Sequence, residues 1–153
     1  MLVWEVGDMA ECGQARADSD LEGFRLGFEL CAAGREWDAH EVWEELWKER
    51  RGTPDGAFLR GLIQWAAAGV KVEAQRMSGA LSLVDKALAT WEALPGRVVF
   101  DGGLPGERED SSEHLTEGAQ AAAFDVDAAR RALIEWRASE GARPLPLPTL
   151  ESA

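Results

Sequence analysis

The chain has 153 residues, of which 46% are hydrophobic and 29% are charged, and its formal net charge at pH 7 is -12. This length and composition predict one globular domain and exclude an intrinsically disordered chain. Because duplex nucleic acid is bound mainly by lysine and arginine that neutralise phosphates, the negative charge argues against a nucleic-acid-binding surface.

The cysteines and the apolar segments predict a cytoplasmic protein. Cys12 and Cys31 are nineteen positions apart, with no C-x-x-C motif and no histidine cluster beside them. This spacing indicates neither a zinc site nor a thioredoxin-like site, and it is typical of a reducing compartment. The N-terminal MLVWEVGDMAECG lacks the basic and apolar regions of a signal peptide. The longest apolar run, Trp65–Val70, is too short to cross a bilayer, so we expect no membrane association.

Apolar residues recur at helical spacing over five segments. The first begins at Leu21 and ends at Gly34, a residue that suits a helix C-terminus. The third is apolar nearly all round, which is typical of a central helix packed on several sides. We predict helices over about 21–33, 36–50, 55–76, 79–94 and 125–136.

Polar residues mark the ends of several of these helices. Ser19 or Asp20 is placed to cap the first helix, and Asp125 to cap the fifth, because each side chain can accept a hydrogen bond from the first turn. Arg50 and Arg51 lie in the last turn of the second helix, where cations suit the helix dipole.

Two segments lack helical spacing. We expect residues 95–123, rich in glycine, proline and acidic residues, to form mostly a flexible surface loop. The C-terminal RPLPLPTL cannot be helical because its prolines remove hydrogen-bond donors, so it either lies as an extended strap along the helices or hangs free. No alternation of polar and apolar residues is long enough to predict a sheet. The predicted fold class is therefore all-α, a single-domain bundle of about five helices at 20–140, with an N-terminal extension at 1–19 and an extended tail at 141–153.

A histidine and a glutamate one turn apart on the second predicted helix form the candidate site. At about 100° per residue, His40 and Glu44 fall at the edge of the apolar arc, beside Trp47. On the third helix, Arg60 and Gln64 lie on a polar stripe of an otherwise apolar cylinder. If the two helices pack antiparallel, the guanidinium and the amide can face the His–Glu pair and donate to its buried carboxylate. The candidate binding residues are His40, Glu41, Glu44, Trp47, Arg60 and Gln64.

Two motifs resemble a known family. The segment AHEVWEELW at Ala39–Trp47 matches an A-H-E-x-x-E-x-x-W stretch, and Gly61–Gln64 matches a G-L-I-Q stretch. Both stretches are hallmarks of the small helical prokaryotic proteins grouped as domain-of-unknown-function family 309. The resemblance covers about Leu21–Leu94, and the chain departs from the family in the turn QRMSGA and in its longer acidic loop. It implies a helical fold and a shared polar cluster, and nothing about a substrate, because the family has no established activity.

Three interpretations of the polar cluster stay open. It is a structural network, the floor of a pocket for a small polar ligand or protein partner, or an acid–base or metal-dependent enzyme site using His40 and Glu44. A lone H-x-x-x-E motif supplies only two metal ligands, so we expect no bound metal and no cofactor. His114 falls in the long loop, and Trp37, off the apolar arc, is a candidate for ligand stacking. Of the functional interpretations we favour a non-enzymatic binding or interaction module, and exposed apolar surface is compatible with a homodimer.

Overall fold

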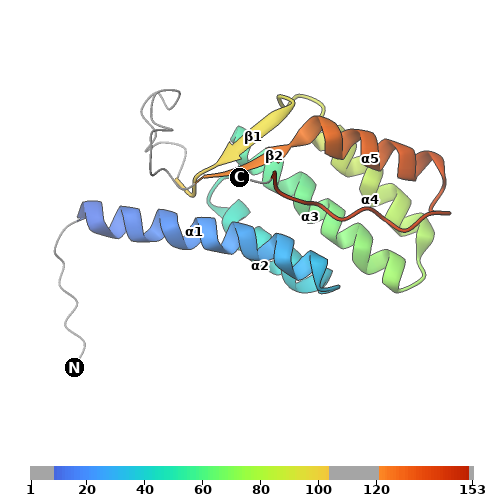
Figure 1. The fold of residues 1–153 in the computed structure, drawn as a ribbon, viewed down its shortest axis with the longest axis horizontal. Helices are drawn as coiled ribbons and strands as arrows, with labels where there is room; N and C mark the ends of the chain where they lie inside the picture. The colour runs from blue at the N-terminus through green and yellow to red at the C-terminus, as the bar shows by residue number, and fades with distance from the viewer. Residues whose placement is uncertain (1–8, 104–120, 152–153) are drawn as a thin grey trace.

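The computed structural model of the protein describes residues 9–103 and 121–151, with side chains described from Asp18 onward. Five helices and one two-stranded sheet make up this part of the chain (Figure 1). The helices are α1 (Met9–Ala32), α2 (Glu36–Lys48), α3 (Pro54–Glu73), α4 (Met77–Thr90) and α5 (Val126–Ala138), and the strands are β1 (Arg97–Phe100) and β2 (Ala122–Asp125). The predicted all-α class is confirmed, since the sheet is a small addition to a helical bundle.

Helix α1 begins at Met9, twelve residues before the predicted start at Leu21. Residues 9–19, expected as an N-terminal extension, are therefore helical, and residues 1–8 lie outside the described part of the chain. Alanine, glutamate, glutamine and arginine together make up six of these eleven residues, and their helix propensity favours continuation of the helix. The cap predicted at Ser19 or Asp20 is wrong because both residues lie inside α1.

Helices adjacent in the sequence are neighbours in space. Helix α1 packs on α2, α2 on α3 and α3 on α4, while α5 packs on α4. Gly34 and Gly52 have φ values of 78° and 77°, which allow the tight turns on either side of α2. Thr53 caps α3 by accepting a hydrogen bond from the N–H of Gly56, and Pro54 occupies the start of the helix. These short connections explain the order of the helices in the bundle.

Two tryptophans join neighbouring helices through close contact with glycine. Trp43 of α2 lies against Gly27 of α1 and donates its indole N–H to a carbonyl oxygen of α1 at 3.0 Å. Trp91, directly after α4, lies against Gly61 and donates to a carbonyl oxygen of α3, also at 3.0 Å. A β-carbon at either glycine would overlap the indole ring. Gly61 of the G-L-I-Q stretch therefore has a packing role.

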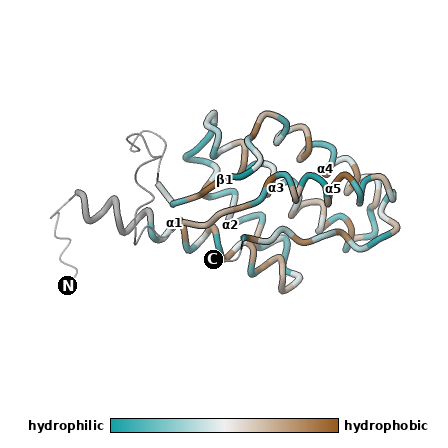
Figure 2. Tube along the Cα trace, turned by 45° about the horizontal axis from the view of Figure 1, so that its top comes forward, coloured by the Kyte–Doolittle hydropathy of each residue, from teal (hydrophilic) through white to brown (hydrophobic). Residues whose placement is uncertain are grey.

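Aromatic rings from the helices and the sheet form the centre of the core. Phe24 of α1 stacks on Phe100 of β1, with ring centroids 4.4 Å apart. Phe124 of β2 contacts the rings of Phe58 and Trp91. Figure 2 shows hydrophobic residues alternating with hydrophilic ones along the helices, as expected for helices that bury one face. The sheet therefore contributes to the core of the helical bundle.

The expectation that the chain contains no sheet is wrong. Strands β1 and β2 pair antiparallel, with Arg97 opposite Asp125 and Phe100 opposite Ala122. Each strand has only four residues, and a long segment separates them, so neither alternation nor a short hairpin turn predicts the pairing. The flexible loop expected within residues 95–123 falls mainly on residues 104–120, which lie outside the described residues.

The proline-rich tail is an extended strap, as one of the two sequence-based alternatives predicted. We define the strap as residues 142–151, and Figure 1 shows it running from the end of α5 back toward β2. The indole N–H of Trp136 donates to the carbonyl of Arg143, and that of Trp65 to the carbonyl of Pro146, both at 2.9 Å. At the far end, the N–H of Glu151 donates to a carbonyl of β2. The strap is thus tied to α3, α5 and β2.

Candidate functional site

His40 and Glu44 lie together on α2, one turn apart, as predicted. Nδ1 of His40 is 3.6 Å from Oε2 of Glu44, and the side chains are 21% and 44% exposed. The imidazole stacks on the Trp37 indole, with ring centroids 5.3 Å apart and an interplanar angle of 4°. Trp37 itself is 57% exposed. Nδ1 is buried without a hydrogen-bond partner, so the pair forms a partly buried polar site at the margin of the core.

The two candidate residues of α3 do not join this pair. Oε1 of Gln64 accepts a hydrogen bond from Oγ1 of Thr90 in α4, at 2.9 Å. Arg60 is exposed and has no ion pair or hydrogen bond to the described side chains or backbone. Among the described residues, the expected four-residue cluster is therefore divided into a His40–Glu44 pair and a Gln64–Thr90 pair.

The position of α3 between α2 and α4 explains this division. Gly69 of α3 lies against Glu36 of α2, whereas Gly61 lies against Trp91 beyond α4. Residues three apart share a helix face, so Gln64 belongs to the face of α3 that carries Gly61 and points toward α4. An amphipathic pattern identifies a buried face, but it does not say which neighbour covers each side of a central helix.

The remaining predicted site residues lie near the surface. Glu41 is exposed. Trp47 is half-buried, and the guanidinium of Arg51 lies over its ring, 4.8 Å from the centroid. This cation–π contact occupies one face of the Trp47 ring.

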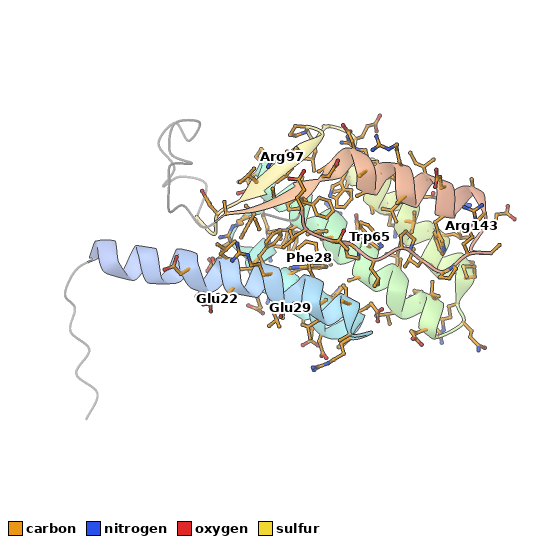
Figure 3. All side chains as sticks on the ribbon, in the orientation of Figure 1. Glu22, Phe28, Glu29, Trp65, Arg97 and Arg143 are labelled. Atoms are coloured by element: carbon orange, nitrogen blue, oxygen red, sulfur yellow. The ribbon has the colours of Figure 1, made fainter. Side chains whose placement is uncertain are left out.

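A cavity of about 400 Å³ lies between the strap and α3, next to the end of α1 and the start of α2. Figure 3 shows Trp65 beneath the strap, and Arg143 where the strap leaves α5. The walls are mostly apolar and come from Trp65, Ala66, Gly69, Val72 and residues 144–148, while Cys31, Glu36, Glu73 and Gln75 supply polar groups. We call this space the strap cavity. None of its lining residues is among the six candidates chosen from the sequence.

The charged groups that the described residues contribute to the strap cavity are all negative. Glu36 and Glu73 line it, and no lysine or arginine is among its lining residues. Burial, and secondarily the Glu36 carboxylate, raise the pKa of the Cys31 thiol to about 12. A thiol with this pKa stays protonated at neutral pH, so Cys31 lines the cavity as a poor nucleophile.

The part of the chain that the structure describes offers neither a multidentate metal site nor a membrane-spanning helix. Within these residues, no three histidine, cysteine, aspartate or glutamate side chains come together so that they could hold a metal ion. His40 and Glu44 supply two ligands, whereas zinc usually takes at least three from the protein. None of the described helices combines the length and the hydropathy that crossing a bilayer requires.

Comparison with known proteins finds a family that is similar to the central helices. Residues 24–83 match the family model described as Domain of unknown function (DUF309). This region of the chain is similar to DUF309. This match confirms the resemblance inferred from the A-H-E-x-x-E-x-x-W and G-L-I-Q motifs, both of which lie inside the DUF309 residues. No curated protein and no solved structure matches the chain.

The strap cavity lies at the boundary of the DUF309 match. The matched residues run from Phe24 in α1 into α4 and include Cys31, Glu36 and Glu73, whereas residues 144–148 of the strap lie outside it. Motifs of the DUF309 domain therefore could not reveal this cavity. The sequence signal that could have revealed it is the proline repeat, since a non-helical tail held on a bundle encloses space against the helix beneath it.

Proposed function

We propose that the protein is a non-enzymatic binding module that takes a small organic cation with an apolar body into the strap cavity. The observation that carries this proposal is a cavity of about 400 Å³ with mostly apolar walls, in which two carboxylates are the only charged groups among the described lining residues. The volume lies within the range of small-molecule sites, roughly 300–1,000 Å³.

An ammonium or guanidinium group would complement the two carboxylates. Neither Glu36 nor Glu73 has an ion pair or hydrogen bond to another described residue through its side chain. A ligand cation would supply the missing opposite charge, while Trp65 and Val72 would contact the apolar part of the ligand. An anionic ligand would be repelled by the same carboxylates.

The chemistry of the lining residues favours binding over catalysis. Cys31 is the only nucleophilic side chain that lines the cavity, and its raised pKa, about 12, keeps the thiol protonated. General acid–base catalysis needs a group that titrates near neutral pH, and no histidine is among the lining residues. His40, the residue that sequence analysis offered as a base, belongs to the separate pair with Glu44.

Calorimetric titration with three probes of similar shape and different charge tests this proposal. We expect 2-phenylethylammonium to bind more tightly than neutral 2-phenylethanol, and 3-phenylpropionate to bind most weakly. Glu36→Gln and Glu73→Gln should each weaken binding of the ammonium probe about threefold, because a partly exposed ion pair contributes roughly 0.2–1 kcal/mol.

Glu22→Gln is the matched control for these variants. Glu22 is an exposed carboxylate on α1, away from the strap (Figure 3), so its removal changes the net charge by the same amount without changing the cavity. Ammonium binding should stay unchanged in this variant. If none of the three probes binds, or if the control weakens binding as much as Glu36→Gln does, the proposal is wrong.

A further inference from the structure

The strap is held on the bundle by contacts to its backbone. Trp136 of α5 donates its indole N–H to the carbonyl of Arg143, and Trp65 of α3 donates to the carbonyl of Pro146, both at 2.9 Å. Figure 3 shows Trp65 under the middle of the strap and Arg143 at its start. We call the surface of α3 and α5 under the strap, with these two indoles, the strap groove.

The two carbonyls that accept these hydrogen bonds have the spacing of a polyproline II helix. They are three residues apart, which is one turn of that helix, so both point to the same side of an extended chain. Pro144, Pro146 and Pro148 favour this conformation by fixing φ at alternate positions and restricting the residues before them. Pro148 is buried, and Leu145 packs against the hydrophobic core.

This geometry resembles a general way in which proteins recognise proline-rich peptides. Aromatic grooves bind such segments because the extended helix is already formed and little conformational entropy is lost on binding. The two indole donors of the strap groove contact carbonyl oxygens, which every polypeptide has, and the prolines place those oxygens. The contacts therefore do not require that the bound segment belong to the same chain.

The connection between α5 and the strap is conformationally strained. Glu140 and Gly141 have φ values of 53° and 81°, and the first of these is in a region that residues other than glycine rarely adopt. At Gly141 a β-carbon would also overlap the Met77 side chain. At its other end, the strap is held by the exposed Arg97–Glu151 ion pair, a backbone hydrogen bond to β2 and the packing of Leu150 against the hydrophobic core. The polar contacts that hold the far end of the strap are thus few.

We propose that the strap groove is a docking site for an extended, proline-rich segment of another protein, and that the strap is its built-in competitor. The partner segment has two carbonyls three residues apart, with prolines at alternate positions, as in the strap sequence RPLPLP. Because the strap is tethered, it competes at high effective concentration and keeps the affinity for such a partner low. This proposal depends on the indole contacts, and because residues 144–148 of the strap also line the strap cavity, displacement of the strap would open that cavity as well.

Binding of a labelled peptide with the sequence RPLPLPTLE to the full chain tests the proposal by fluorescence anisotropy. The informative variant is Gly141→Ala, which strains the connection and weakens the strap. Its matched control is Gly34→Ala, at a glycine of nearly equal φ, 78°, with open space around it in the turn between α1 and α2. We expect Gly141→Ala to reach half-saturation at about tenfold lower peptide concentration than Gly34→Ala, because only the former releases the competitor.

A second peptide and a second measurement complete the experiment. The peptide RALALATLE keeps the length but loses the preformed extended helix, and it should bind at least about tenfold more weakly. In an NMR titration of the wild-type chain, the backbone amide signals of the strap should shift with the proline peptide and not with the alanine peptide, because the displaced strap leaves the groove while the Trp65 and Trp136 indoles keep equivalent partners. This titration decides the question if Gly141→Ala does not fold.

Three outcomes would overturn the proposal. They are equal peptide binding by the two glycine variants, equal binding of the two peptides, and the absence of shifts in the strap amide signals at millimolar peptide. Concentration-dependent dimerisation of Gly141→Ala without peptide binding would also overturn it, since the strap of a second copy would then be the occupant of the groove.

Discussion

Replacing Gly61 with alanine is expected to destabilise the protein, although alanine is normally the better helix residue. Gly61 lies in the interior of α3, and a β-carbon at this position overlaps the Trp91 indole. Trp91 is fully buried, and its N–H donates to the carbonyl of Phe58 at 3.0 Å. The ring cannot move aside without breaking that hydrogen bond or displacing Phe124, whose ring centroid is 5.6 Å away.

The expected magnitude follows from three opposing contributions. Helix propensity favours alanine over glycine by about 1 kcal/mol. Overpacking of a core costs about 1–3 kcal/mol, and a buried indole N–H that loses its acceptor costs about 1–3 kcal/mol. The free energy of unfolding should therefore fall by about 3 kcal/mol, which corresponds to a decrease in Tm of roughly 6–12 °C for a domain of this size.

Thermal unfolding followed by circular dichroism measures this change, with Gly23→Ala as the matched control. Gly23 lies inside α1, and a β-carbon there meets Cγ1 of Val42 at 3.8 Å, an ordinary van der Waals contact. The same substitution should therefore raise Tm by about 1–4 °C at this position, through helix propensity alone. If Gly61→Ala melts at or above the wild-type Tm and the Trp91 indole signal is unshifted, the reasoning from close packing is refuted.

Three further predictions concern buried polar groups. Arg50 is fully buried and donates to the Asp20 carboxylate. Arg50→Met leaves that carboxylate unpaired, so the free energy of unfolding measured in urea should fall by about 3 kcal/mol. A loss below about 1 kcal/mol would contradict this prediction. The pKa of the Cys31 thiol in the folded state, about 12, exceeds the value of 9.0 for a free thiol. The unfolded state therefore loses this proton at lower pH, and the free energy of unfolding should fall as the pH rises from 9 toward about 12. Urea unfolding at pH 8 and pH 10.5 should show a smaller decline for Cys31→Ser than for the wild type, and equal declines would exclude this linkage. His40→Ala should cost only about 1 kcal/mol in thermal unfolding, because its contact with Glu44 is 3.6 Å long and partly solvated; a loss of several kcal/mol would support the buried-network interpretation.

Local features of the fold were predictable from the sequence. The cap at Asp125 is confirmed, because its side chain accepts a hydrogen bond from the N–H of Ala128 at the start of α5. The proximity of His40 and Glu44 is also confirmed, since residues four apart on a helix are neighbours whatever the rest of the chain does. These predictions succeed because they depend on atoms within one turn of each other.

The role of Arg50 was not predictable in the same way. Its position near the end of α2 predicts a cation that interacts with the helix dipole at the surface. In the structure its guanidinium is fully buried, 2.9 Å from the Asp20 carboxylate of α1 and 2.9 Å from the carbonyl of Gly102 after β1. Phe100 of β1 lies beneath it, with the ring centroid 5.1 Å away. Arg50 is buried because other segments of the chain pack around the end of α2, and its guanidinium links them.

Except for residues 9–19 of α1, the sequence by itself determined which segments are helical, where several of them begin and end, that the proline-rich tail is extended, and that two motifs of one family are present. Only the tertiary structure decided that Gln64 faces α4, that β1 pairs with β2, and that the strap encloses a cavity against α3. The physical reason is that periodicity and capping depend on neighbouring residues, whereas these three features depend on the contact between segments far apart in the chain. The direction in which a central helix turns each side chain is set by the packing of its neighbours, and no local pattern records that choice.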